Sequence, residues 1–139
     1  MNIKSIINSI QGLLAVVGGF LGWFLGELNG LLYALIAFVV VDYITGVLVA
    51  LLEKRLSSEV GFRGILKKVF IFVLVGIGNI IDIHLLKNGG AIRTAVIFFY
   101  LSNEGISILE NCSNAGLPIP DKLKFVLEQF SKTEKVEGQ

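Results

Sequence analysis

Apolar residues fill four long stretches of the chain, and polar residues interrupt each stretch at only a few positions. The stretches cover roughly residues 6–26, 31–52, 68–86 and 91–110. A helix rises 1.5 Å per residue and needs about 20 apolar residues to cross the hydrocarbon core of a bilayer. The pattern therefore predicts an all-α membrane protein with about four transmembrane helices, the third of which can begin as early as Ser57 or Ser58.

The connections between the stretches predict how the helices follow one another. Residues 27–30 and 87–90 are short, so we expect consecutive helices to form antiparallel hairpins. Residues 53–68 carry the main cluster of positive charge, which favours the cytoplasmic side. Four spans then place both termini in the cytoplasm. If the first stretch lies flat in the membrane interface instead, three spans remain and the amino terminus is outside.

A helix-breaking segment separates the membrane region, residues 1–116, from residues 117–139. Pro118 and Pro120 lack an amide donor, so the fourth helix must end before them. Asp121 is placed to cap a following helix, in which apolar residues recur at helical spacing: Leu123, Val126, Leu127 and Phe130. This spacing predicts a short cytoplasmic amphipathic helix, on the membrane surface or against a partner, and a disordered tail from Thr133.

Composition supports the membrane assignment and argues against several classes of function. Of the 139 residues, 54% are apolar and only 17% are charged, which is little charge for a soluble domain. The net charge of +1 argues against a nucleic-acid partner. One cysteine and one histidine leave no basis for a disulfide framework or a cysteine-clustered metal site. Because the sequence has no catalytic, cofactor-binding or metal-binding motif, we do not expect an enzyme.

Small residues form a stripe along the first predicted helix. Gly18, Gly22 and Gly26 recur at intervals of four, which brings them onto one face. Such a stripe lets two helices approach closely in lipid, where close packing replaces the hydrophobic driving force. The stripe predicts either self-association between subunits or tight packing against the second helix of the same chain.

The other three predicted helices each carry a stripe of polar or small residues. A carboxylate at the centre of a bilayer costs roughly 3 kcal/mol on insertion scales, so these residues will seek one another or water. The stripes therefore predict the lining of an aqueous path, or a seam between helices or subunits. Their members are Asp42, Thr45, Gly46, Asn79, Asp82, Arg93, Tyr100, Asn103, Glu104 and Ser107.

Position along the helices predicts two contacts within these stripes. Asp42 and Glu104 lie about 16–20 Å from the outer ends of their helices at the standard rise. We expect the two carboxyl groups to meet near the middle of the bilayer and to share a proton while the protein is dispersed in lipid. Asp82 and Arg93 flank the outer turn, so their charges can meet across the hairpin and neutralise each other.

Several short motifs, taken in their order and spacing, resemble those of a known family. They are Asp42-Tyr-Ile-Thr-Gly46, Gly61-Phe-Arg-Gly64 with Lys67-Lys68, Asp82, Arg93-Thr94, Asn103 to Asn111, and Gly116-Leu-Pro-Ile-Pro120. Over roughly residues 30–130 the chain resembles the toxin-secretion and phage-lysis holins of Gram-positive bacteria and their prophages. The resemblance implies a protein that accumulates in the bacterial cytoplasmic membrane, assembles with itself and forms lesions. These lesions release a phage endolysin, which lyses the host cell, or a toxin.

Two other functions are compatible with the polar stripes. One is a small ion channel or transporter subunit in which Asp42 and Glu104 bind ions. A transporter would be expected to have internal repeats, and the two halves of the sequence have none. The other is an antiholin, which binds a separate holin without permeabilising the membrane.

Overall fold

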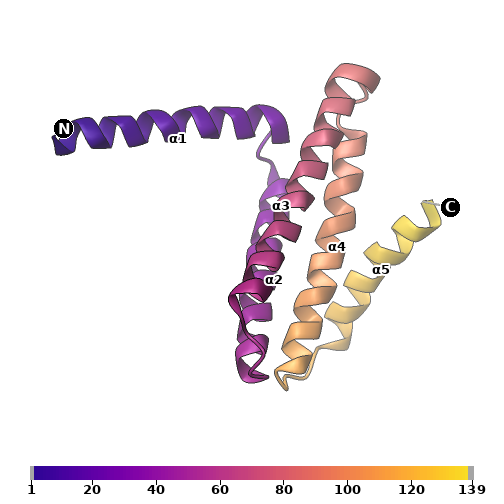
Figure 1. Ribbon diagram of the computed structural model, residues 1–139. Coiled ribbons are helices and arrows are strands. Elements are labelled where there is room, and N and C mark those ends of the chain that lie inside the picture. The colour runs from indigo at the N-terminus through magenta and orange to yellow at the C-terminus, as the bar shows by residue number, and fades with distance from the viewer. Residues whose placement is uncertain (1, 138–139) are drawn as a thin grey trace.

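The chain is helical throughout most of the part that the computed structural model describes, which is residues 2–137, with side chains for residues 2–129. Figure 1 shows α2 (Gly30–Leu52), α3 (Ser58–Ile80) and α4 (Ala91–Asn114) side by side, and α1 (Ile3–Leu25) and α5 (Asp121–Glu137) leaving them. A short π-helix, η1 (Ile81–Leu86), continues α3 to the turn. As predicted, four helices are long and apolar enough to cross a bilayer: α1, α2, α3 with η1, and α4.

Capping side chains fix where three of the helices begin. Asn2, Asn29 and Ser57 each accept a hydrogen bond from the backbone amide three residues further on. These caps satisfy amides that have no partner within the helix. The cap at Ser57 explains why α3 begins well before the apolar stretch that starts at Lys68.

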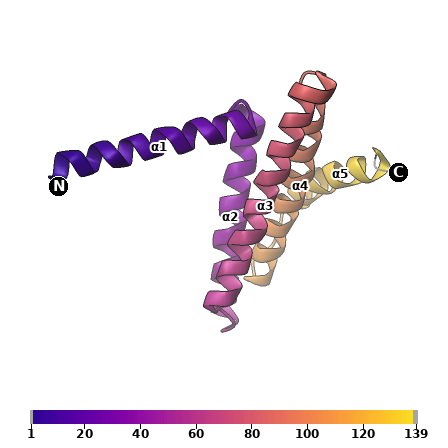
Figure 2. The same cartoon turned by 45° about the horizontal axis from the view of Figure 1, so that its top comes forward.

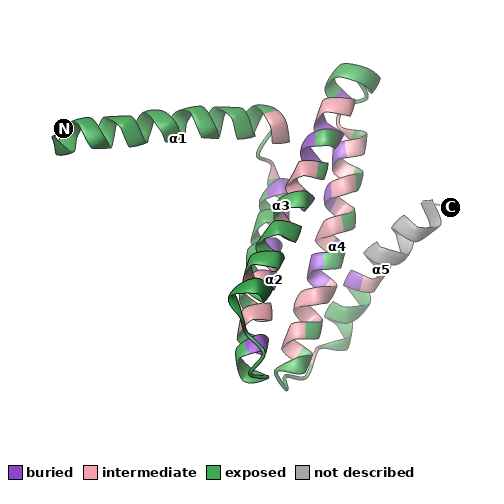
Figure 3. Ribbon diagram, in the orientation of Figure 1, coloured by how far each residue is buried: buried purple, intermediate pink, exposed green. Residues whose placement is uncertain are grey.

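A small apolar core holds α2, α3 and α4 together. Its buried side chains come from all three helices: Leu32, Leu35, Val39, Ile71, Val75 and Ile97. Gly78 lets α3 approach the backbone of α4, because a Cβ there would lie 3.2 Å from the Cα of Arg93. Many large apolar side chains of the bundle are exposed, as expected for helices surrounded by lipid. Figure 3 shows exposed residues on each of the bundle's helices.

α1 does not form the antiparallel hairpin with α2 that its short connection suggested. Figures 1 and 2 show α1 running across the direction of α2, and among the described residues it packs against α3 and not against α2. Gly26, with a φ of 88°, makes the turn between them. The expected hairpin of the third and fourth helices is confirmed, since α3 and α4 lie side by side.

Within the described part of the chain, the glycine stripe of α1 has no contact along most of its length. A Cβ built on Gly18 or Gly22 would meet nothing within 4 Å, and no residue of α1 is buried. The alternative in which this stripe packs against the second helix is therefore wrong for this structure. Gly26 differs, because a Cβ there would lie 2.6 Å from Asn79 Oδ1.

α5 turns back from the end of α4 at an angle and packs against α4 (Figure 1). Leu127 is buried, and both Leu127 and Phe38 of α2 reach the space that a side chain on Gly105 of α4 would occupy. The partner of this amphipathic helix is therefore α4 of its own chain. The side chain of Phe130, the last member of the predicted apolar stripe, lies outside the described part.

The end of the chain differs from expectation at two points. Asp121 is the first residue of α5 and not its cap, because the amide of Lys124 already donates to the carbonyl of Pro120. The tail predicted to be disordered from Thr133 is helical as far as Glu137, and residues 138–139 lie outside the described part. Lysine and glutamate are good helix formers, which accounts for the longer helix.

Candidate functional site: an ion network and a helix corner

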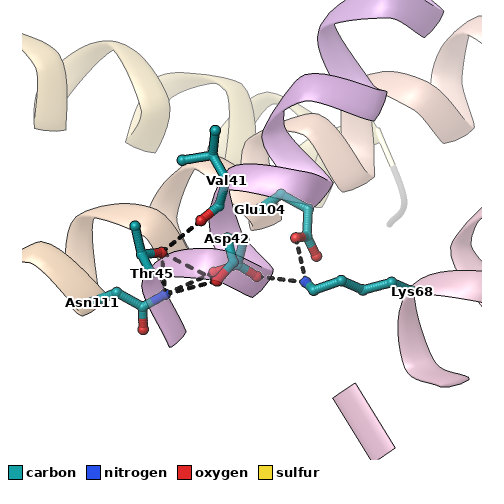
Figure 4. Close-up of polar contacts among 6 residues, drawn as sticks. All are labelled: Val41, Asp42, Thr45, Lys68, Glu104 and Asn111. Carbon is teal, nitrogen blue, oxygen red and sulfur yellow. Dashed lines mark hydrogen bonds and ion pairs between the residues drawn. The ribbon is translucent and has the colours of Figure 1, made fainter. Parts of the chain in front are cut away.

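Three charged side chains meet inside the bundle, one from each of α2, α3 and α4 (Figure 4). The Nζ of Lys68 donates to Oδ2 of Asp42 and to Oε2 of Glu104, each at 2.7 Å. The side chains are only 9% (Asp42), 10% (Glu104) and 16% (Lys68) exposed. A buried charge is tolerated when it is paired and hydrogen-bonded, and here one ammonium group serves two carboxylates.

Two polar side chains extend this cluster toward the end of α4. The amide of Asn111 donates to Oδ1 of Asp42 at 2.9 Å and to Oγ1 of Thr45 at 2.9 Å. Thr45 in turn donates to the carbonyl of Val41 at 2.8 Å (Figure 4). We call Asp42, Thr45, Lys68, Glu104 and Asn111 the central ion network.

A cavity of about 230 Å³ adjoins the central ion network. Its lining includes Asp42, Lys68, Ser107 and Asn111, and it extends to Arg55 in the connection between α2 and α3. The volume is enough for several water molecules at about 30 Å³ each. The network is therefore within reach of water from the α2–α3 end of the bundle.

A second group of polar side chains holds the end of α1. The amide of Asn79 donates to the carbonyls of Trp23 and Phe24, at 3.3 and 3.1 Å, and Nε of Arg93 donates to the carbonyl of Leu25 at 2.7 Å. The last carbonyls of a helix have no partner within it, and leaving them unsatisfied in an apolar environment costs free energy. Asn79 and Arg93 therefore supply the missing donors.

Asp82 completes this second group by holding the start of α4. Its two carboxylate oxygens accept hydrogen bonds from the backbone amides of Ile92 and Arg93, at 2.9 and 2.7 Å. A negative charge at a helix amino terminus is stabilised by the free amides and by the helix dipole. We call Asn79, Asp82 and Arg93, with the end of α1, the α1 corner.

Comparison with known proteins identifies the family. The sequence model of the bacteriophage holin family matches residues 19–132. A protein of Bacillus phage phi105 named "Probable holin" is 36% identical over 69% of this chain and 74% of its own. The chain belongs to the bacteriophage holin family.

Other relatives of this holin-family member match most of its length. An uncharacterised 14.9 kDa protein of Clostridium perfringens is 42% identical over 92% of this chain and 97% of its own. An uncharacterised protein of Listeria monocytogenes is 46% identical over 81% of this chain and 80% of its own. No solved structure matches. Family membership and the apolar helices together make this a multi-pass membrane protein.

The two groups divide the predicted stripe residues of this holin-family member between them. Asp42, Thr45 and Glu104 meet in the central ion network, where Ser107 lines the cavity and Gly46 lies beside Asn111. Asn79, Asp82 and Arg93 meet at the α1 corner instead. Two members take part in neither group: Asn103 is exposed, and Tyr100 packs beside the apolar core with its ring edge-on to Phe99.

Two predicted contacts exist, but with different chemistry. Asp42 and Glu104 do come together, and the ammonium group of Lys68, which was not expected there, binds both; the proton that the two acids were expected to share stays a prediction. Asp82 and Arg93 also meet, yet the carboxylate binds the backbone amide of Arg93 while its guanidinium group turns to α1.

Lys68 is the charged member of the central ion network that the sequence interpretation missed. It was counted with the positive charges near the cytoplasmic side. A signal for its role was present, because Lys68 and Asp42 each lie about 15 Å from the α2–α3 ends of their helices at the standard rise. Their equal distance from the α2–α3 connection predicts that the side chains of Lys68 and Asp42 can meet.

Proposed function

We propose that this protein acts as a holin of the bacterial cytoplasmic membrane. It accumulates there, assembles with copies of itself and forms lesions that release an endolysin, which lyses the host cell, or a toxin. Family membership and the phage relative support this function. The supporting observation in the structure is the central ion network, which sits inside a bundle whose outer faces are apolar.

The physical argument rests on where the charges can find partners. In a dispersed subunit, Asp42, Lys68 and Glu104 satisfy one another, so the bundle can stay in lipid at low cost. When subunits assemble, the same charged side chains can face water that lies between the subunits. Hydration then takes the place of the ion pairs within each subunit. This change from internal ion pairs to hydrated side chains is cooperative, since no single subunit can enclose a water-filled path by itself.

Charge around the connections supports an orientation. Lys54, Arg55, Arg63 and Lys67 lie in or near the α2–α3 connection, and positive residues favour the cytoplasmic side. This connection and the end of α4 then face the cytoplasm. The cavity beside the central ion network would open on the same side.

Induction of the gene alone in a bacterium tests the proposal. A holin gives a delayed and abrupt loss of membrane potential, and lysis when an endolysin is also present. Steady growth with full membrane potential would refute it. An antiholin would not kill alone and would delay lysis by a co-expressed holin, while an ion channel would lower the potential gradually without releasing a protein.

A matched pair of variants tests whether the carboxylates take part. Glu104→Gln removes a charge from the central ion network, and Glu110→Gln removes one from an exposed position on the same helix. We expect Glu104→Gln to shift the time of lysis and Glu110→Gln to leave it unchanged. Equal timing in both variants at equal protein levels would argue against a role for Glu104.

A further inference from the structure

α1 is an apolar helix that the rest of the chain leaves uncovered. It extends away from the bundle, crosswise to α2, in both views (Figures 1 and 2), and Figure 3 shows it exposed along nearly its whole length. No residue of α1 is buried. An apolar helix of this length requires a partner, and its direction relative to α2 decides which one it can reach.

The α1 corner fixes that direction. Asn79 and Arg93 hold the carbonyls of Trp23, Phe24 and Leu25, so the last turn of α1 is bonded to both α3 and α4. The ring of Phe24 also fills the space where Gly76 has no side chain. Bonds to two helices and one inserted ring restrict both the angle and the rotation of α1.

The two faces of α1 differ in chemistry. At 100° per residue, large apolar side chains gather on one face: Ile3, Ile6, Ile10, Leu13, Val17 and Leu21. The opposite face carries polar or small residues: Lys4, Ser5, Asn8, Gly12, Ala15 and Gly19. A helix divided in this way suits a boundary between an apolar and a polar phase.

Contacts at the corner show which way the apolar face points. Phe24 belongs to the apolar side of α1 and its ring meets Gly76, whereas its carbonyl is bonded by Asn79. Gly76 lies about 4.5 Å further toward the α2–α3 end of the bundle than Asn79 at the standard rise. The apolar face of α1 is therefore turned toward the middle of the bundle's length, where the acyl chains lie.

The level of α1 matches a membrane interface. Trp23 and Tyr33 are exposed at the corner, and such aromatic residues concentrate at the boundary between acyl chains and headgroups. The 23 residues of α2, which begins beside the corner, span about 34 Å, close to the thickness of a hydrocarbon core. If α2, α3 and α4 cross the bilayer, α1 lies at its surface.

We infer that α1 is an interfacial helix whose partner is the lipid of the leaflet on the α3–α4-turn side. Its apolar face enters the acyl boundary and its small and polar face meets the headgroups. The amino terminus is then on the outer side and three helices span, in place of the four-span arrangement with both termini inside. The inference needs the membrane bundle but not lesion formation, so its failure and that of the proposed holin function are distinguishable.

Depth measurements on the full-length protein in vesicles of phosphatidylethanolamine and phosphatidylglycerol test the inference. Single cysteines replace Ile3, Ile10 or Val17 in a Cys112→Ser background, and an attached fluorophore is quenched by lipids labelled at shallow or deep positions. An interfacial α1 gives shallow quenching at all three sites. A spanning α1 puts Ile10 and Val17 within about 6 Å of the bilayer centre, which would overturn the inference.

A matched scan on α2 controls for correct insertion. Cysteines at Ala37, Ile44 and Leu51, which are exposed and seven residues apart, must show deep quenching at Ala37 and Ile44, within about 6 Å of the middle of α2, and shallow quenching at Leu51 if α2 spans. If the α2 scan shows correct insertion and the fluorophores on α1 are quenched by neither class of lipid, another protein surface covers α1. That outcome would also overturn the inference.

The side of the membrane gives a second readout. In intact protoplasts, a membrane-impermeant maleimide should label Lys4→Cys, at the start of α1, without lysis. Glu59→Cys, at the start of α3, should be labelled only after lysis. Labelling of both sites only after lysis would place the amino terminus in the cytoplasm and contradict the proposed position of α1.

Discussion

The central ion network and the α1 corner both bury polar side chains in an apolar bundle, but their partners differ. In the network, Lys68 binds the side chains of both Asp42 and Glu104, so ionisable side chains are paired with one another. At the corner, Asn79 and Arg93 bind backbone carbonyls of α1. A charged side chain can replace its charged partner by water. The free backbone groups at a helix end need a hydrogen-bond partner from the protein wherever water is absent.

This difference separates two tasks within one chain. The network is the region suited to respond to hydration, because its cavity reaches the α2–α3 end of the bundle and its side chains are polar or charged. The corner is suited to hold an angle, because its bonds fix the main chain of two helices at once. Variants that remove one interaction at a time can test whether the two tasks are independent.

The largest effect is expected from Lys68→Met in the central ion network. It leaves two buried carboxylates without their ammonium partner, and breaking a buried ion pair from one side costs about 3–5 kcal/mol. The free energy of unfolding in detergent micelles measures the loss. Lys67→Met is the control, since Lys67 is exposed on the same helix.

A neutral variant of the network separates the effect of unpaired charge from the loss of packing. Replacing Asp42, Lys68 and Glu104 together by Asn, Met and Gln should recover most of the stability, because no unpaired charge remains. If Lys68→Met is as stable as Lys67→Met, the network does not hold the bundle together.

A smaller effect is expected from Asn79→Leu at the α1 corner. It removes the donors to the carbonyls of Trp23 and Phe24, and an unsatisfied buried group costs about 1–3 kcal/mol. The angle of α1 should broaden, which spin-label distances between α1 and α4 can measure. Asn103→Leu replaces an exposed asparagine and serves as control; equal distance distributions in both variants would rule out a holding role for Asn79.

Gly105→Leu should displace α5 while sparing both polar regions. A Cβ at Gly105 would lie 2.9 Å from Leu127, and overpacking of this kind costs about 1–3 kcal/mol. Protease cleavage in the connection before α5 should become faster. Gly18→Leu, at a glycine with open space around it, should cleave like the parent. Unchanged cleavage of Gly105→Leu would mean that α5 has another attachment.

The smallest effect on stability is expected from Gly22→Leu. A Cβ there meets no described residue within 4 Å, so the free energy of unfolding should stay within about 0.5 kcal/mol of the parent. Gly18 lies at the border of the two faces of α1 and Gly22 on the adjoining edge of the small and polar face, so a copy that approaches in the membrane plane can contact both. Crosslinking in membranes should therefore give fewer oligomers, and an unchanged ladder would exclude the stripe from subunit contacts.

The sequence interpretation was most successful where local chemistry decides. The apolar stretches located the four long helices, Ser57 marked the start of α3, and the two prolines marked the break before α5. It failed where a contact partner comes from a distant part of the chain. Lys68 was assigned to a surface cluster, and the short connection after α1 was taken for a hairpin turn, although a short loop does not set an angle.

The sequence by itself determined that the chain forms long apolar helices and that each carries polar residues in need of partners. Helix length, caps and the cost of charge in lipid act locally, so they can be read from residue type and spacing. Only the tertiary structure decided which partners are used: Lys68 for two carboxylates, and Asn79 and Arg93 for the carbonyls of α1. The way in which α2, α3 and α4 pack determines which side chains come within hydrogen-bond distance of one another. The spacing of residues along the sequence does not contain that information.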